Sequence, residues 1–290
     1  MSGTRKGQGV NRRVLVTGAG GYLGHHVVRE LLDEGHDVVA VDVSTEGIDP
    51  RAQVSTHDIF SDPKGLVDQF GAPDVLVHLA WKDGFSHNSY AHMDNLSSHF
   101  VFLRTMVELG CPQISVMGTM HEVGYWEGAI TESTPCNPLS QYGVAKNALR
   151  QSMTLLAQSL GFRLLWLRAY YIVGDDARGN SIFAKITQAA AEGQKEFPFT
   201  SGKNKCDFID IDELAAQIAT ASTQDRVTGI VNVCSGVPVS LADRVEQFIA
   251  DHEYDITLAY GTFPDRPYDS PEVYGDATRI REIMAGAEDA

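Results

Sequence analysis

The sequence predicts an α/β fold, with a doubly wound parallel sheet and a smaller irregular lobe towards the C-terminus. Short β-rich apolar runs alternate with longer segments of helical apolar spacing over roughly the first 170 residues. The apolar runs are continuous, which is typical of strands that are buried on both faces of a parallel sheet. After that point the regularity is lost, and polar loops separate the remaining helical patterns.

The predicted strands are short and rich in valine, leucine and isoleucine. They cover Arg13–Thr17, Asp37–Val41, Val54–Asp58, Val75–Leu79, Ile114–Val116 and Arg163–Leu167. Helical spacing of apolar residues predicts the intervening helices at Leu23–Leu32, Leu96–Leu109 and Tyr142–Leu160, and later helices at Ile182–Ala191, Ile211–Ala221 and Leu241–Ile249. Ligands of such sheets bind where the strands end, so residues at the carboxyl ends of strands are the first candidates for function.

A glycine-rich turn joins the first strand to the first helix. The run TGAGGYLG at 17–24 places Gly18, Gly21 and Gly24 three residues apart. Glycine there lets backbone N–H groups approach a pyrophosphate at the helix N-terminus. Asp42 ends the second strand 42 − 24 = 18 residues later, where a carboxylate can hydrogen-bond the adenosine ribose. The pattern predicts a Rossmann-type dinucleotide site. Tyr22 and Leu23, which belong to the same run, are also predicted to contact the cofactor.

The acid at Asp42 favours NAD over NADP, because a carboxylate repels the 2′-phosphate. NADP stays an alternative, since Arg51 or His25 could offset that charge. Asp58 and Ile59, which end the third predicted strand, suit the adenine amino group and ring, although Asp58 equally fits a turn cap. We therefore expect an NAD(P)-binding domain at 11–170, to which a segment near 205–233 returns, and a substrate-binding lobe at 171–286.

A second pattern combines a threonine, a tyrosine and a lysine. Tyr142 and Lys146 lie four residues apart, on one face at the start of a predicted helix. The lysine ammonium is expected to stabilise the phenolate and to lower the pKa of Tyr142 towards neutrality, which would make Tyr142 a general acid/base. Thr119 follows the strand Ile114–Val116 and would hold and polarise a substrate carbonyl.

These features resemble the extended short-chain dehydrogenase/reductases, in the branch of nucleotide-sugar epimerases, dehydratases and reductases. SVMGTMHEVG at 115–124 is similar to the family's SSS-x-x-x-Y-G stretch, which makes Thr119 its catalytic hydroxyl beside Tyr142 and Lys146. HLAW at 78–81 is similar to the family's H-L-A-A strand end, and Asn95 to its helix asparagine. The resemblance implies that the cofactor also contacts Leu79, Ala80, Trp81, Asn95, Tyr142 and Lys146.

The C-terminal half carries further matches. Arg168 with Gly174 resembles L-R-x-x-N-x-x-G, CDFIDI at 206–211 resembles R-D-Y-I-x-V, and VNVCSG at 231–236 resembles Y-N-x-G-x-G. RPYD at 266–269 looks like the tail whose arginine binds the substrate pyrophosphate. The resemblance covers residues 13 to about 283 and implies that the substrate contacts Thr119, Met120, His121, Tyr171, Asn180 and Arg266.

Departures from the family's pattern narrow the expected chemistry. Cys206 replaces an arginine, so one phosphate contact is missing or has moved to Lys203 or Lys205. Met120 and His121 replace the Asp-Glu pair with which the family's dehydratases eliminate water, so dehydration is disfavoured. His121 and Glu122 either act on the substrate or point to solvent, and the sequence leaves both readings open.

The resemblance implies an NAD(P)-dependent oxidoreductase of nucleoside-diphosphate sugars, and the compact length of 290 residues favours reduction of a 4-keto-6-deoxyhexose. A UDP-glucose 4-epimerase-like enzyme is the alternative, because it uses the same three residues. A non-catalytic dinucleotide-binding sensor is a further alternative, disfavoured because Thr119, Tyr142 and Lys146 are all present. The resemblance also implies a homodimer, through the helices near Leu96 and Tyr142.

Composition excludes other classes of function. The chain has 23 Lys and Arg against 38 Asp and Glu, a net charge of −15, which argues against a nucleic-acid or membrane-surface partner. Arg168 interrupts the longest apolar stretch, and the polar segment Met1–Asn11 predicts no secretion. The four scattered cysteines fit free thiols in the cytoplasm. His87, His92 and His99 lack the spacing of metal ligands, so we expect no metal and interpret them as helix-face or loop residues.

Overall fold

The computed structural model describes residues 10–174, 181–265 and 270–288. Two predicted substrate contacts, Asn180 and Arg266, lie outside the described residues. Within the described ranges, no helix is long and apolar enough to cross a membrane.

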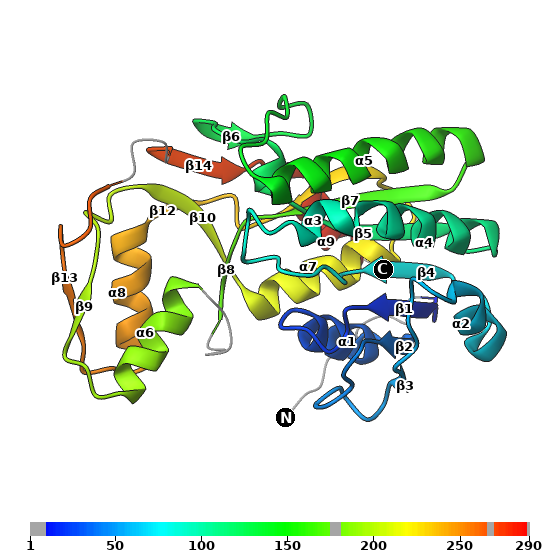
Figure 1. The fold of residues 1–290 in the computed structure, drawn as a ribbon, viewed down its shortest axis with the longest axis horizontal. Helices are drawn as coiled ribbons and strands as arrows, with labels where there is room; N and C mark the ends of the chain where they lie inside the picture. The colour runs from blue at the N-terminus through cyan, green and yellow to red at the C-terminus, as the bar shows by residue number, and fades with distance from the viewer. Residues whose placement is uncertain (1–9, 175–180, 266–269, 289–290) are drawn as a thin grey trace.

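The larger lobe is built on a seven-stranded sheet in the order β11-β7-β5-β4-β1-β2-β3 (Figure 1). Every neighbouring pair in it is parallel. Its strands are β1 (Arg13–Thr17), β2 (Asp37–Val41), β3 (Gln53–Ser55), β4 (Val75–His78), β5 (Gln113–Thr119), β7 (Arg163–Ala169) and β11 (Gly229–Val233). The predicted doubly wound, Rossmann-type fold is confirmed.

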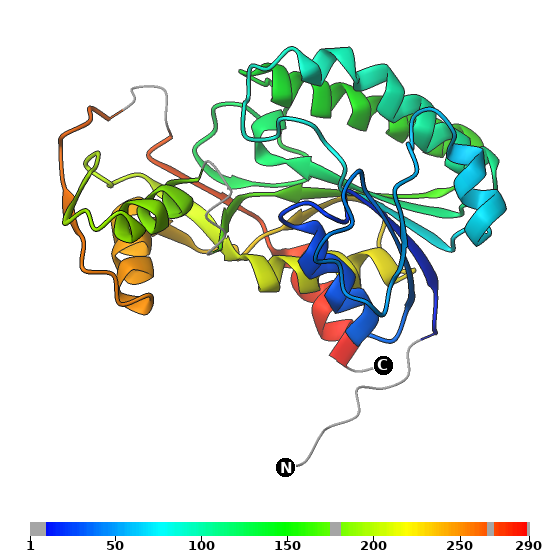
Figure 2. The ribbon, with the colours of Figure 1, turned by 60° about the horizontal axis from the view of Figure 1, so that its bottom comes forward.

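Helices cover both faces of this sheet (Figure 2). On one face lie α1 (Gly24–Asp33), α7 (Ile211–Thr223) and α9 (Thr278–Glu288). On the other face lie α2 (Pro63–Phe70), α3 (Ala91–Asp94), α4 (Leu96–Glu108) and α5 (Gln141–Leu160). Successive side chains of β1 pack on opposite faces of the sheet, since Val14 and Val16 belong to one buried cluster and Leu15 to the other. This two-sided burial explains why the strands read as continuous apolar runs.

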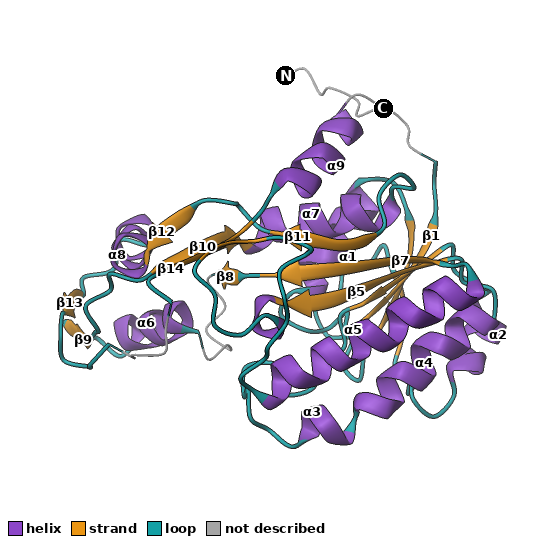
Figure 3. Cartoon of the chain, turned by 90° about the horizontal axis from the view of Figure 1, so that it is seen from above, coloured by secondary structure: helices purple, strands orange, loops and turns teal. Residues whose placement is uncertain are grey.

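The smaller lobe lies beyond the carboxyl ends of the central strands (Figure 3). Its elements are β6 (Gly128–Ile130), β8 (Tyr171–Val173), α6 (Ile182–Ala191), β9 (Glu196–Pro198), β10 (Lys205–Asp210), β12 (Pro238–Ser240), α8 (Leu241–Asp251), β13 (Thr257–Ala259) and β14 (Glu272–Gly275). A separate aromatic core that includes Phe183, Phe199 and Phe248 holds this lobe together. The boundaries 11–170 and 171–286 stay a prediction.

Four strands end elsewhere than the sequence predicts. β4 stops at His78 instead of Leu79 and β7 continues to Ala169 instead of Leu167, and the larger differences are in the third and fifth strands. The third strand stops at Ser55 instead of Asp58, because the Asp58 carboxylate accepts the backbone N–H of Phe60 at 2.9 Å and turns the chain away from the sheet edge. The fifth strand continues to Thr119 rather than stopping at Val116, because it stays paired with β7 to its last residue. Thr119 is therefore fixed by the sheet itself.

Candidate active site

The strand order reverses between β1 and β4, which places a crevice at the carboxyl ends of these strands. The glycine-rich turn follows β1, Leu79–Trp81 follow β4, and Thr119 ends β5. The fold therefore brings together three segments that the sequence separates by about a hundred residues. The candidate site is built at this edge of the sheet.

The glycine-rich turn is shaped for close backbone approach. Gly18 has φ +75°, and a Cβ there would lie 2.5 Å from the backbone nitrogen of Ala80. A Cβ at Gly24 would collide with the carbonyl oxygen of Gly18. Helix α1 begins without a side-chain cap and without an acid in its first turn, so its terminal N–H groups are available. The residues present therefore fit the pyrophosphate of a dinucleotide.

Asp42 lies directly beside this turn. Its carboxylate accepts the backbone N–H of Gly20 at 3.0 Å, which fixes it against the glycine-rich turn. Arg51 does not offset its charge, because the guanidinium is 2.7 Å from carboxylate oxygens of both Asp33 and Asp49. The Asp42 carboxylate would repel the 2′-phosphate of NADP, and the Arg51 guanidinium is not available to offset this repulsion. The geometry therefore favours NAD over NADP.

Thr119 and Tyr142 meet across the crevice. Thr119 is buried, and its hydroxyl accepts the backbone N–H of His121 at 3.3 Å. Tyr142 lies in the first turn of α5, where the Ser140 hydroxyl caps the helix by accepting the Gly143 N–H at 3.1 Å. The Thr119 side chain lies near enough to the Tyr142 hydroxyl to lower the pKa of Tyr142, although burial and Glu122 raise that pKa more.

Lys146 does not lower the pKa of Tyr142 as the sequence predicts. Burial raises the pKa of the tyrosine above its usual value, and the Glu122 carboxylate raises it further. The Lys146 ammonium lies 5.9 Å from the centre of the Tyr142 ring and donates instead to the Met117 carbonyl at 2.7 Å. The spacing of four residues gives a shared helix face, but it does not reveal that both groups are desolvated.

Trp81 is the unexpected neighbour of Lys146. The ammonium lies 3.9 Å from the centre of the indole ring, and this cation–π contact stabilises the charged form of Lys146. Burial nevertheless lowers the pKa of Lys146 to about 7. The family's pattern has a small residue at this position, so the indole platform is a feature of this chain.

Histidines surround Trp81 and Tyr142. His87 lies in the loop after β4, His92 in α3 and His99 in α4, so they are loop and helix residues as the sequence predicts, but two of them are buried. His92 and His99 are 1% and 2% exposed. The Trp81 indole donates to Nδ1 of His92 at 3.0 Å, and Nε2 of His92 lies 3.0 Å from the Ser86 carbonyl. Because an indole only donates and a carbonyl only accepts, His92 is the neutral tautomer with its proton on Nε2.

A second histidine pair lies beneath the crevice. His78 bridges Thr17 Oγ1 at 2.7 Å and His99 Nδ1 at 2.9 Å. The ring of His99 stacks on Trp81 with centroids 4.4 Å apart. The only hint in the sequence is the density of histidines between residues 78 and 99, because the contacts themselves are tertiary. No group of three potential metal ligands was found among residues 10–174, 181–265 and 270–288.

Glu122 neither acts on the substrate nor points to solvent, so both readings of this residue are corrected. Its side chain is fully buried, and Oε1 accepts the Thr119 N–H and the Trp166 indole, both at 2.8 Å. Oε2 lies 3.5 Å from the guanidinium groups of Arg150 and Arg168. Glu122 therefore fixes the backbone of Thr119 from the buried side, through the hydrogen bond that it accepts from the Thr119 N–H.

The remaining residues that the sequence predicts to bind cofactor or substrate lie in different environments. Ile59 is buried in the core, and Asp58 is exposed in its turn. The Asn95 amide donates to the Ala91 carbonyl at 2.9 Å, at the junction of α3 and α4. Tyr171 packs on Phe208, and Met120 is 7% exposed. Lys205 lies 3.5 Å from the Glu272 carboxylate, whereas Lys203 is exposed.

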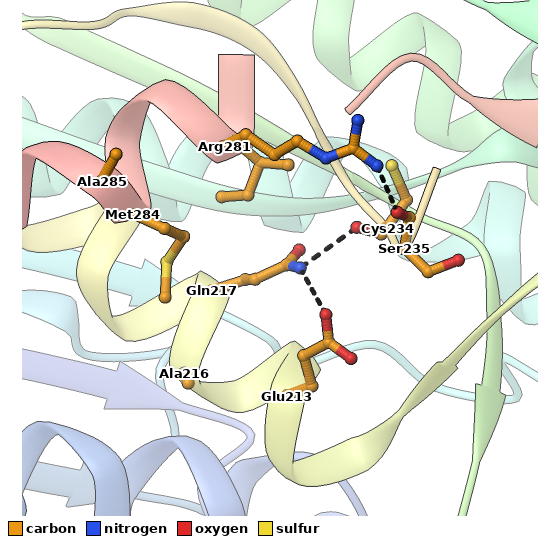
Figure 4. Close-up of a pocket in the computed structure, with 9 residues that line it drawn as sticks. Glu213, Ala216, Gln217, Cys234, Ser235, Arg281, Met284 and Ala285 are labelled. Atoms are coloured by element: carbon orange, nitrogen blue, oxygen red, sulfur yellow. Dashed lines mark hydrogen bonds between the residues drawn. The ribbon is translucent and has the colours of Figure 1, made fainter. Parts of the chain in front are cut away.

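A pocket of about 390 Å³ lies apart from these residues, between α7 and α9 (Figure 4). Gln217 lies at its centre and donates to the Cys234 carbonyl at 3.1 Å and to Glu213 at 3.3 Å. Arg281 donates to the Ser235 carbonyl at 3.0 Å. None of the predicted site residues lines this pocket.

The low pKa values of the buried His99 and the partly buried His121 predict an acid-sensitive fold. Burial lowers the pKa of His99 to about 3 and that of His121 to about 4. Unfolded histidine titrates near 6.5, so the unfolded chain binds more protons below that pH and stability falls as the pH drops from about 6.5 towards 4. We expect each residue to lower the free energy of unfolding by about 2 kcal/mol at pH 5, measured by urea denaturation. Equal stability at pH 7 and pH 5 would show that these histidines are not held neutral.

Comparison with known proteins assigns the family. The profile of the "NAD dependent epimerase/dehydratase family" matches residues 14–234. The chain belongs to this family. Membership confirms the predicted resemblance and the prediction of an NAD-dependent enzyme.

The relatives within the family differ in their sequence identity to this chain. A "dTDP-6-deoxy-L-talose 4-dehydrogenase (NAD(+))" of Aggregatibacter actinomycetemcomitans is 46% identical over 269 residues, covering 90% of this chain and 98% of the relative. A UDP-glucose 4-epimerase of Lactobacillus helveticus is 24% identical, covering 94% and 91%. Among solved structures, a UDP-glucose 4-epimerase of Stenotrophomonas maltophila has a TM-score of 0.82 at 21% identity, covering 95% and 93%. The last similarity supports the fold alone.

Proposed function

We propose that this NAD-dependent oxidoreductase of nucleotide sugars interconverts the C4 alcohol and C4 ketone of a dTDP-linked 6-deoxyhexose, with 6-deoxy-L-talose as the alcohol. The observation that carries the proposal is the meeting of Thr119, Tyr142 and Lys146 at the crevice of a chain that is 46% identical to a dehydrogenase of that sugar. The sequence-based expectation of a 4-keto-6-deoxyhexose reductase describes the same reaction in its reductive direction.

In this proposal, 11–170 with the segment near 205–233 hold the cofactor and 171–286 hold the sugar nucleotide. NAD, when bound, supplies the hydride acceptor or donor. The Thr119 hydroxyl orients the C4 oxygen, and the Tyr142 hydroxyl protonates that oxygen in reduction or removes its proton in oxidation. Lys146, held by Met117 and Trp81, keeps a positive charge near the tyrosine.

The test is a stoichiometric assay with purified protein, NAD and dTDP-6-deoxy-L-talose. We expect nicotinamide absorbance to rise in proportion to the 4-keto sugar formed, and to fall when the ketone is supplied with NADH. A 4-epimerase would isomerise sugar with no net change in absorbance. Binding of NAD without turnover of any nucleotide sugar would instead identify a sensor.

We also propose a homodimer formed through α4 and α5. Val101, Val144 and Leu155 are 42%, 39% and 67% exposed on these two adjacent helices, and an uncovered apolar surface favours association. Light scattering should give twice the 31.6 kDa chain mass, and changing Val101 and Leu155 to Glu should give the monomer. A monomeric unaltered protein would refute this assembly.

A cytoplasmic location is proposed as well. Cys111, Cys136 and Cys234 are free thiols, which suits a reducing compartment. NAD and nucleotide sugars are also substrates of cytoplasmic metabolism. Fractionation of cells that express the full protein tests the location, and recovery with an oxidising compartment would contradict it.

A further inference from the structure

Two histidines flank Tyr142 on the side of the loop after β4. The His87 ring stacks on the Tyr142 ring with centroids 5.5 Å apart and planes 14° apart, and the His121 ring lies 4.3 Å from His87. Both are tied to the reacting groups through the backbone. The Tyr142 N–H donates to the His87 carbonyl at 2.9 Å, and the His121 N–H donates to Thr119 Oγ1 at 3.3 Å. The two rings therefore keep their place relative to Thr119 and Tyr142.

The ring nitrogens of these two residues differ from those of the other histidines nearby. Both nitrogens of His78 and of His92 have protein partners. In the part of the chain that the structure describes, no ring nitrogen of His87 or His121 has a hydrogen-bond partner. Both side chains are only partly buried, so a ligand in front of Tyr142 can reach them. Polar groups beside a reacting side chain that lack an internal partner are suited to bind substrate.

The charge of the pair limits what it can bind. Burial and the neighbouring His87 lower the pKa of His121 to about 4, and burial also lowers the pKa of His87. Both rings are therefore neutral near pH 7, and each offers one N–H donor and one nitrogen acceptor. A hydroxyl group, which both donates and accepts, matches such a ring. A phosphate only accepts, so it would leave the acceptor nitrogen of each ring unpaired and would find no positive charge on the rings.

We propose that His87 and His121 are specificity residues that hydrogen-bond the C3 hydroxyl of the hexose. The inference rests on the proposed function, in which Thr119 and Tyr142 hold the oxygen on C4. Of the two ring carbons next to C4, C5 carries the ring oxygen and the methyl group of a 6-deoxyhexose, whereas C3 carries a hydroxyl. The C3 hydroxyl is thus the hydroxyl on the carbon next to C4, and the two imidazoles are polar groups next to Tyr142 without a protein partner among the residues that the structure describes.

The experiment compares kcat/KM for dTDP-6-deoxy-L-talose and for its 3-deoxy analogue. The variants are His87→Phe and His121→Phe, which keep a flat ring and remove both nitrogens, and His121→Gln, which restores a donor and an acceptor. His252→Phe, in a remote residue whose ring packs on Phe248, is the matched control. Calorimetry with each sugar nucleotide and with NAD measures binding separately.

We expect the unaltered protein to prefer the 3-hydroxy sugar by roughly 10-fold to 100-fold. Each phenylalanine variant should lose about 10-fold on that sugar and little on the 3-deoxy analogue, while His121→Gln recovers part of the preference and NAD binding stays unchanged. Equal losses on both sugars, or an unchanged preference in both phenylalanine variants, would overturn the assignment. If the unaltered protein neither binds nor converts either sugar, the proposed function fails and the assignment fails with it.

Discussion

Replacing Tyr142 with phenylalanine should reduce turnover by about 10²-fold to 10⁴-fold, because the proton transfer to and from the C4 oxygen would lose its donor and acceptor. The phenyl ring retains the packing of the tyrosine against His87, His92 and Trp81, so the fold should be unchanged. NAD binding, which the glycine-rich turn and Asp42 provide, should also be unchanged. The measurements are steady-state turnover, fluorescence titration with NADH and thermal unfolding.

Tyr90→Phe is the matched control for this substitution. Tyr90 is 82% exposed and precedes the short helix α3, so the same loss of a hydroxyl should leave turnover within about twofold. If Tyr142→Phe retains normal turnover, Tyr142 is not the general acid/base and the proposed mechanism is wrong. A loss of NADH binding in that variant would instead place the tyrosine hydroxyl in the cofactor site.

The raised pKa of Tyr142 has a consequence for the oxidative direction. A phenolate that can take a proton from the C4 alcohol requires positive charge nearby, since burial and Glu122 both oppose its formation. Lys146 supplies part of that charge, but burial lowers its own pKa to about 7. The Trp81 ring at 3.9 Å favours the charged form of the lysine, so the indole supports Tyr142 indirectly.

Local patterns were sufficient to predict six of the seven strands of the sheet and the glycine-rich turn, because these depend on spacing within short stretches of chain, whereas the edge strand β11 was not predicted. The turn needs Gly18 in a left-handed conformation, and the strands need continuous apolar runs. The pairing of Thr119 with Tyr142 could be predicted from the family's pattern. Desolvation could not, since it depends on what the rest of the chain packs around Lys146 and Tyr142.

The histidine contacts lie at the limit of what sequence can predict. His87 and His121 are 34 residues apart in the chain and meet only because β4 and β5 are neighbours in the sheet. The spacing of the histidines predicts no tight metal-ligand pair, but it does not indicate which rings are buried in the core and which lie beside Tyr142. That distinction decides between a structural histidine and one that can bind substrate.

Removing the Glu122 carboxylate should have the largest effect on stability, and it shows why an acid follows the reacting threonine so closely. Glu122→Ala leaves the fully buried Arg168 guanidinium without its carboxylate and takes the acceptor from the Thr119 N–H and the Trp166 indole. An unpaired buried charge costs about 3–5 kcal/mol, which we expect to see in urea denaturation. Glu122→Gln keeps an oxygen acceptor without the charge, so its loss of stability should lie between zero and that of Glu122→Ala. The control is Glu108→Gln, which removes a charge from an exposed pair with Arg104 and should change stability by less than about 0.5 kcal/mol. In Glu122→Ala, turnover should fall more than the loss of stability alone explains, because the Thr119 N–H loses the acceptor that fixes its backbone. A stable, fully active Glu122→Ala protein would show that the two arginines find other partners and that Thr119 is held by its strand alone.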